Sequence, residues 1–151
     1  MKSIRPIGPS EHRACERVLR SLPRWFGIES ALVQYVEDCQ SLPTWVGSCD
    51  ETICGFATIR RHFAGAAEIH CIAVQPDLHR CGVGRALVGR IEQELRADHV
   101  QFLQVKTLGP SRSNAEYDRT RRFYEAIGFV PLEEFPKLWP GNPALQMVKR
   151  I

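Results

Sequence analysis

The sequence predicts an α/β fold: one mixed sheet of about six or seven strands, flanked by about four helices. Apolar residues recur at strand spacing in some segments and at helical spacing in others. The segments follow one another as a strand, two helices, three strands, a helix, a strand, a helix and two strands, an order typical of helices packed on one sheet. The 151 residues, 44% hydrophobic and 25% charged, contain no repeat or internal boundary. Residues 1–151 are therefore expected to form a single domain.

The first half of the chain begins with a short strand at 3–8. Residues 11–40 have helical spacing, and Pro23 divides them into two helices because proline interrupts a helix. Segments 44–49 and 53–63 are two strands separated by a short polar turn, which predicts a hairpin.

The second half begins with a strand at 68–76 that is apolar on both faces in its second half, as a central buried strand is. Pro76 ends it, since proline has no amide to donate. A helix follows, with one apolar face formed by Val83, Leu87, Ile91 and Leu95. The remaining segments are predicted as a strand at 101–108, a polar loop at 109–118, a helix at 119–129 and strands at 129–135 and 144–151.

Charge and composition exclude several classes of function. The net charge of +3 is compatible with an anionic ligand but gives little support for nucleic-acid binding. The six cysteines show no CxxC pair and no metal-ligand spacing. We therefore expect reduced, buried thiols and no metal site. No apolar run is long enough to cross a bilayer, and the first ten residues lack the apolar core of a signal peptide. The expected location is the cytoplasm.

The stretch HRCGVGRALV, residues 79–88, places Gly82 and Gly84 at the start of a helix. Amides in the first turn of a helix have no partner within it, and the helix dipole favours negative charge there. Glycines let a phosphate approach the backbone, and Arg80 and Arg85 add positive charge. The stretch predicts a pyrophosphate-binding loop; a tight turn without a ligand is the alternative. Leu87 replaces the third glycine of a dinucleotide fingerprint, and the Walker loop is absent.

With these features the chain resembles the GNAT superfamily of N-acetyltransferases over nearly its whole length. HRCGVG is similar to the family's pyrophosphate motif, in which Gln or Arg is followed by two residues, Gly, one residue, and Gly or Ala; His79 stands at the first position. RRFYEAIGF resembles a later helix of the family, in which an aromatic pair precedes three residues and Gly-Phe.

The resemblance implies that the strand at 68–76 splays from its neighbour and that acetyl-CoA, the cosubstrate, lies in the opening. The pantetheine arm and thioester would face the backbone of Ile72, Ala73 and Val74. Tyr117 stands where the family often has an asparagine that contacts CoA, and it is included among the predicted CoA-binding residues. The residues predicted to form the pyrophosphate loop are His79, Arg80, Cys81, Gly82, Val83, Gly84 and Arg85.

Two residues are predicted to be catalytic. Tyr124 matches the tyrosine that lies near the CoA sulfur in the family, and its hydroxyl would protonate the leaving thiolate; a core aromatic is the alternative. Glu68 lies eleven residues before His79, where some GNAT histone acetyltransferases have their general base. Alternatively, Glu68 is a solvated carboxylate at a strand end, and ordered water acts as the base. His70 would relay a proton or be structural. Cys81 is expected to fill space rather than react.

The function expected from these observations is transfer of an acetyl group from acetyl-CoA to a primary amine by direct attack in a ternary complex. The acceptor would be a small molecule or a peptide, and Trp25, Phe26 and Tyr35 would line its pocket or belong to the core. The alternatives are a non-catalytic acyl-CoA-binding or sensing module, and an acetyltransferase toxin that acts on aminoacyl-tRNA. Membrane and nucleic-acid partners are not expected; a homodimer is compatible with the resemblance.

Overall fold

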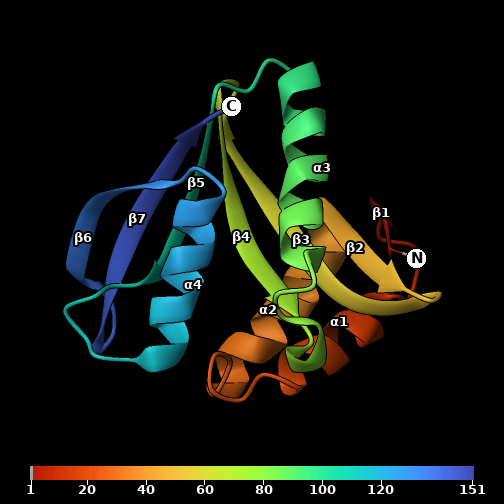
Figure 1. The fold of residues 1–151 in the computed structure, drawn as a ribbon, viewed down its shortest axis with the longest axis horizontal. Helices are drawn as coiled ribbons and strands as arrows, with labels where there is room; N and C mark the ends of the chain where they lie inside the picture. Colours follow the sequence, from red (N-terminus) through yellow and green to blue (C-terminus); the bar gives the residue numbers. More distant parts are fainter. Residues whose placement is uncertain (1) are drawn as a thin grey trace.

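The computed structural model describes residues 2–151, which form seven strands, four α-helices and one short 3₁₀-helix (Figure 1). The order along the chain agrees with the order that the sequence predicts. The elements are β1 (Lys2–Pro6), α1 (His12–Arg20), α2 (Glu29–Ser41), β2 (Thr44–Cys49), β3 (Thr52–Phe63), β4 (Ala66–Val74), η1 (Pro76–Leu78), α3 (Val83–Ala97), β5 (Phe102–Leu108), α4 (Ala115–Ala126), β6 (Val130–Trp139) and β7 (Asn142–Arg150).

All seven strands belong to one sheet, in the order β1-β2-β3-β4-β5-β7-β6. The β4–β5 pair is parallel, and the other five pairs are antiparallel. A parallel pair needs a crossover, and here α3 provides it. The predicted mixed sheet with four flanking helices is therefore confirmed.

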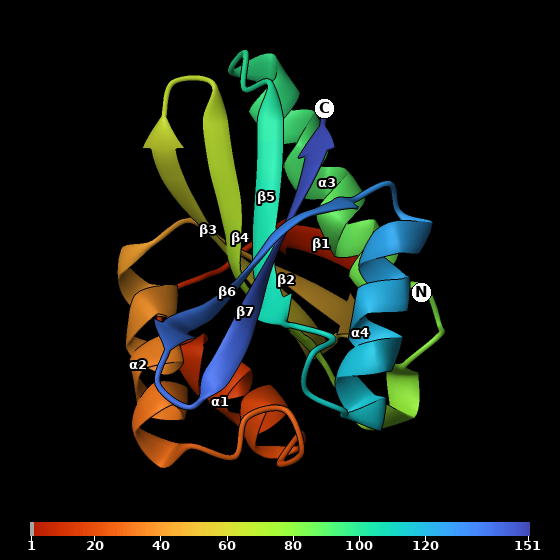
Figure 2. The same ribbon diagram turned by 90° about the vertical axis from the view of Figure 1, so that its left-hand side faces the viewer.

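The helices cover the two faces of the sheet, α1 and α2 on one and α3 and α4 on the other (Figure 2), and enclose two apolar clusters. Helix α3, with Leu87 and Ile91 fully buried, packs with Tyr124 of α4 against one face. Helices α1 and α2 pack against the other face around Phe56 and Leu19. Each helix buries one apolar stripe, which is the main source of stability for helices of this length.

Strands β4 and β5 pair over only part of their length. Their ladder ends at Ile69 and Val105, although β4 continues to Val74 and β5 to Leu108. Figure 1 shows the two strands close together at one end and apart at the other, with the α1–α2 connection and the β6–β7 turn at the open end. The expected splayed pair is thus present at the centre of the sheet.

A β-bulge coincides with the start of the opening. Thr58 of β3 pairs with Cys71 and Ile59 pairs with Ile69, so that His70 is the extra residue. A bulge of this kind reverses the alternation of side chains. Ile69 therefore packs in the α3 cluster, whereas Cys71 packs against α1 and α2.

The largest boundary differences from the sequence prediction are the start of α4 and the end of β6. Helix α4 begins at Ala115 rather than at 119, because the Asn114 side chain accepts a hydrogen bond from the Tyr117 amide (3.0 Å) and caps the first turn. The predicted ten-residue loop is consequently a connection of six residues, 109–114. Strand β6 extends to Trp139, so that β6 and β7 form a hairpin. None of the helices within residues 2–151 is both long enough and apolar enough to span a membrane.

Candidate active site

The first turn of α3 presents unpartnered backbone amides. Gly82 is the N-cap and has no side chain that could cap the helix. The Ala86 amide donates to the Gly82 carbonyl (3.0 Å), as the first intrahelical bond. The amides of 83–85 precede that bond, and within residues 2–151 none of them has a capping partner. This is the arrangement that binds an anion at a helix N-terminus, and it lies directly after the open end of β4.

The two glycines of this turn serve different purposes. Gly82 has φ = +82°, in the left-handed region that favours glycine. A Cβ added to Gly84 would lie 3.1 Å from Cζ of Phe123, so Gly84 allows the Phe123 ring of α4 to pack against α3. The sequence predicted a phosphate-binding loop or a tight turn for both glycines; this contact between helices depends on the tertiary structure.

His79 turns back toward the sheet. Its Nε2 lies 2.7 Å from the Val74 carbonyl, to which a protonated Nε2 donates, and its ring lies edge-on to Trp25 with centroids 5.6 Å apart. In this structure His79 therefore fixes the end of β4. It also occupies the carbonyl of Val74, one of the β4 groups that the family resemblance predicts to face the pantetheine arm.

Helix α4 is connected across the opening to the α1–α2 segment. The Tyr117 hydroxyl donates to the Trp25 carbonyl (2.9 Å), and Trp25 Nε1 donates to the Thr120 hydroxyl (3.1 Å). Arg24 pairs with Glu116 at 3.0 Å. These contacts join residues more than ninety positions apart and connect α4 to the α1–α2 segment. Tyr117, predicted to bind CoA, is thereby held in place by a backbone carbonyl.

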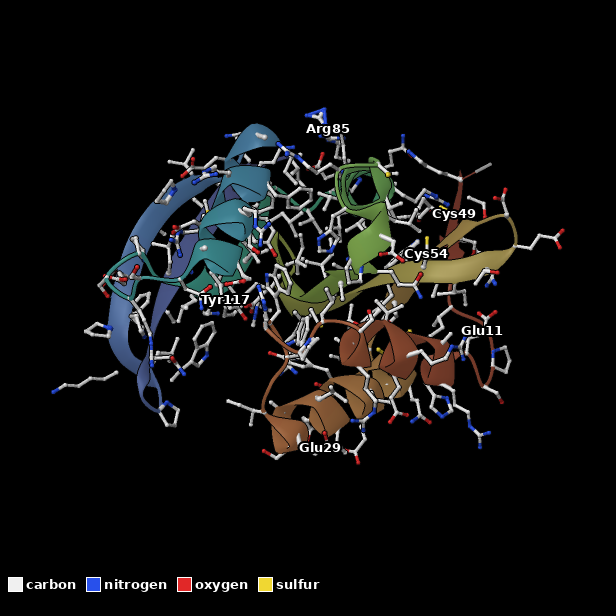
Figure 3. All side chains as sticks on the ribbon, turned by 60° about the horizontal axis from the view of Figure 1, so that its bottom comes forward. Glu11, Glu29, Cys49, Cys54, Arg85 and Tyr117 are labelled. Carbon is white, nitrogen blue, oxygen red and sulfur yellow. The ribbon has the colours of Figure 1, made fainter. Side chains whose placement is uncertain are left out.

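The other residues of the predicted loop lie around the same turn. Arg85 is exposed and reaches the Ala126 carbonyl of α4 (3.3 Å; Figure 3). Arg80 has φ = +64°, and Cys81 is exposed, with its carbonyl accepting from Lys2 Nζ. All six cysteines are free thiols; Cys49 and Cys54 lie on the side of α3 away from α4 (Figure 3).

Tyr124 lies in the apolar cluster beneath α4 and also lines the cleft. Its side chain is 4% exposed and packs edge-on to the rings of Phe123 and Phe129. Burial raises the pKa of Tyr124 well above its usual value. The phenol is therefore neutral at physiological pH and keeps its proton available for donation.

Glu68 is held between two cationic or polar partners on neighbouring strands. His62 Nε2 of β3 lies 2.6 Å from Oε1, and Lys106 Nζ of β5 donates to Oε2 at 3.0 Å. Glu68 is buried, whereas the His62 side chain is about one-third exposed. The three residues therefore form a polar chain from the cleft to solvent.

His70 faces the same side as Glu68, as its spacing predicts. Its Nε2 lies 2.7 Å from Asp38 Oδ2 of α2, and its ring packs against Tyr35. Burial opposes ionisation of Asp38, but hydrogen bonds from Gln34 and His70 outweigh burial and lower the pKa of Asp38. His70 thus has a structural partner, Asp38, that lies 32 positions away and has no local signature.

One cavity of about 1690 Å³ is lined by residues from each of these groups, among them His79, Glu68 and Tyr124. It begins at the first turn of α3, passes through the opening between β4 and β5, and reaches Tyr35, Glu68 and Trp139 on the opposite side. Ile72, Ala73 and Val74 line its centre, where β4 has no partner on β5. This volume exceeds a typical pocket for one small molecule and suits two substrates that meet in the middle.

Several residues of the cleft were absent from the sequence prediction. His62 and Lys106 gave no local signal, because both lie in strands where a polar residue is commonly solvated. Thr107 is buried beside the opening, but nothing in the local sequence distinguishes it from other threonines in strands. Only the pairing of β4 with β3 and β5 brings these three residues to Glu68 and the cleft.

Comparisons with known proteins agree with this geometry. Solved structures that share the fold include a GNAT-family protein from Desulfovibrio desulfuricans (20% identity, 99% of each chain, TM-score 0.86). The ribosomal-protein-S18-alanine N-acetyltransferase from Escherichia coli is 21% identical over 100% of this chain and 94% of its own, with a TM-score of 0.80. An aminoglycoside 6′-N-acetyltransferase complexed with coenzyme A is 15% identical over 98% of this chain and 96% of its own, with a TM-score of 0.78.

At these identities the structural matches establish the fold alone. A comparison with curated proteins gives no match. The family model described as "Acetyltransferase (GNAT) domain" matches residues 40–131, more than half of the chain, including the splayed strands and α3. The protein therefore belongs to the GNAT family of acetyltransferases.

Proposed function

We propose that the protein transfers an acetyl group from acetyl-CoA to a primary amine by direct attack in a ternary complex. One observation carries the proposal: the β4–β5 ladder ends at Ile69 and Val105, and the opening leads to three unpartnered amides at the start of α3. The opening has room for an extended arm beside β4, and the amides can donate hydrogen bonds to a pyrophosphate. A ternary complex is supported by a cavity that reaches both faces of the sheet.

Within this proposal Glu68 is the general base. An amine attacks only after it loses its proton, and the Glu68 carboxylate takes that proton. His62, hydrogen-bonded to Glu68 Oε1, passes the proton to solvent through its exposed side. Lys106, hydrogen-bonded to Glu68 Oε2, holds the carboxylate group in position.

Tyr124 completes the reaction as the general acid. The amine nitrogen bonds to the thioester carbon, an unpaired amide of β4 stabilises the oxyanion, and the carbon–sulfur bond then breaks. Tyr124 gives its proton to the departing CoA thiolate and regains one, through water, from the new amide nitrogen. The products are the N-acetylated amine and CoA with a free thiol, and one proton leaves through Glu68.

The acceptor enters from the side opposite α3. The relatives named above act on an alanine of a ribosomal protein and on an aminoglycoside, so both peptide and small-molecule amines are used on this fold. Phe26 and Tyr35 pack edge-on to each other and line that half of the cavity together with Trp139. An amine attached to an apolar or planar group fits these walls.

Thermal unfolding with acetyl-CoA, ATP or NAD tests the proposal first. A ligand at a hundred times its Kd stabilises a protein by about 2.7 kcal/mol, which raises Tm by roughly 5–10 °C at this size. A shift specific to acetyl-CoA is expected, followed by thiol release on addition of an amine acceptor. Binding with no thiol release from any peptide or small-molecule amine would favour an acyl-CoA-binding module; absence of a shift in the folded protein would refute the proposal.

A further inference from the structure

Thr107 of β5 has a buried hydroxyl group with no hydrogen-bond partner. In the part of the chain that the structure describes, only two buried side-chain polar atoms lack a partner, Thr107 Oγ1 and Trp45 Nε1. Thr107 is 4% exposed and lines the cleft, whereas Trp45 does not. A buried hydroxyl without a partner is destabilising, so its position beside a binding cleft suggests that a ligand supplies the missing partner.

The position of Thr107 is fixed by the sheet. Its backbone pairs with Leu145 of β7, and it lies two residues beyond Val105, where β5 stops pairing with β4. Strand alternation puts its side chain on the face of Val105, which belongs to the same apolar cluster as Tyr124. Thr107 therefore lies at the narrow end of the opening, on the side of the proposed general acid.

The hydroxyl can reach a ligand without any movement of the backbone. Rotation about the Cα–Cβ bond exchanges the hydroxyl and methyl groups of threonine, and both rotamers are accessible in a strand. No internal hydrogen bond holds the hydroxyl in its present rotamer. A carbonyl oxygen placed in the opening would therefore gain a donor at little cost.

We infer that Thr107 Oγ1 donates a hydrogen bond to the carbonyl oxygen of the acetyl thioester. This inference rests on the proposed function. The pyrophosphate end of acetyl-CoA belongs at the first turn of α3, beyond Val74, so the acetyl end reaches the narrow end of the opening, where Thr107 lies. The carbonyl oxygen becomes more negative as the amine attacks, and a hydrogen bond to it then becomes stronger.

The test uses Thr107→Val and Thr107→Ser, with binding of acetyl-CoA and of CoA measured for each by calorimetry. Valine has the same shape but no hydroxyl. Without ligand, Thr107→Val should melt at the same temperature as the parent protein or higher, because no hydrogen bond is lost. Its affinity for acetyl-CoA should fall roughly two- to tenfold, the size of one neutral hydrogen bond, while its affinity for CoA is unchanged. Thr107→Ser should bind acetyl-CoA like the parent.

Thr58→Val is the matched control. Thr58 is fully buried and its hydroxyl is 3.0 Å from that of Thr44, so this variant should melt at a lower temperature than the parent. Equal loss of acetyl-CoA and CoA affinity in Thr107→Val would place the contact on the pantetheine arm and overturn the thioester assignment. Unchanged affinity for both would overturn the inference while leaving the proposed function intact. A parent protein that binds neither ligand would overturn both.

Discussion

Lys106 Nζ donates a hydrogen bond to Glu68 Oε2 at 3.0 Å, at the end of the ladder between β4 and β5. The pair connects the two strands at the point where their backbones separate. Both side chains are largely buried, at 26% and 11% exposure, so the charges interact more strongly than a surface pair would. The ion pair that positions the candidate base therefore lies at the start of the opening between the strands.

Replacing Glu68 tests its assignment as the base. Glu68→Gln should lower kcat for amine acetylation roughly hundredfold, the lower range for loss of a general base. The amide retains the shape of the side chain, so acetyl-CoA affinity should be unchanged. Glu37→Gln, on the exposed face of α2, is the control and should be fully active. Parent-like turnover of Glu68→Gln over the whole pH range would assign proton removal to water instead.

Replacing Tyr124 tests the general acid. Tyr124→Phe should lower kcat roughly hundredfold with little change in Tm, since the ring keeps its contacts with Phe123 and Phe129. Because burial raises the pKa of Tyr124, the phenol stays protonated up to pH 10, and its titration should produce no fall in kcat below that pH. Steady-state rates from pH 6 to 10 provide the measurement. If Tyr124→Phe turns over like the parent, another group or water protonates the thiolate.

Glu11 predicts a specific loss of stability in acid. Hydrogen bonds from the Arg5 guanidinium (2.7 and 2.9 Å) and the Gly8 amide (2.6 Å) lower the pKa of Glu11 from 4.5 to about 2. A pKa lowered by folding stabilises the protein fully above pH 4.5, and this stabilisation is lost as the pH falls toward 2. At pH 7 the Tm of Glu11→Gln should therefore be slightly lower than that of the parent, since the pair is partly exposed. Near pH 2 the two proteins should have the same Tm. A gap in Tm that persists unchanged at pH 2 would contradict this assignment.

The glycines of α3 offer a matched pair of alanine substitutions. An alanine Cβ at Gly89 meets no atom within 4 Å, so Gly89→Ala should stabilise the protein by about 0.5–1 kcal/mol. At Gly84 the Cβ meets the Phe123 ring at 3.1 Å, and the ring must shift. Gly84→Ala should therefore be less stable than Gly89→Ala and should weaken acetyl-CoA binding. Equal Tm values for the two variants in a denaturation assay would show that Phe123 adapts freely.

Short-range patterns predicted most of the fold. Apolar spacing identified β4 and α3, because buried residues recur at strand spacing in β4 and at helical spacing in α3. The glycines at 82 and 84 marked the turn between these two elements. The start of α4 was predicted too late, because the residues of its first turn are polar and its cap at Asn114 was not recognised. The bulge at His70 was not foreseen, since it depends on the register between two strands.

The sequence by itself determined the order of elements, the family resemblance and the glycine-containing turn before α3, because these depend on residues close together in the chain. Only the tertiary structure placed Lys106 and His62 on Glu68, and Trp25 against α4, since residues up to 95 positions apart meet there. It also revealed the unpartnered hydroxyl of Thr107. Whether a polar group has a partner depends on every element packed around it, and no local pattern contains that information.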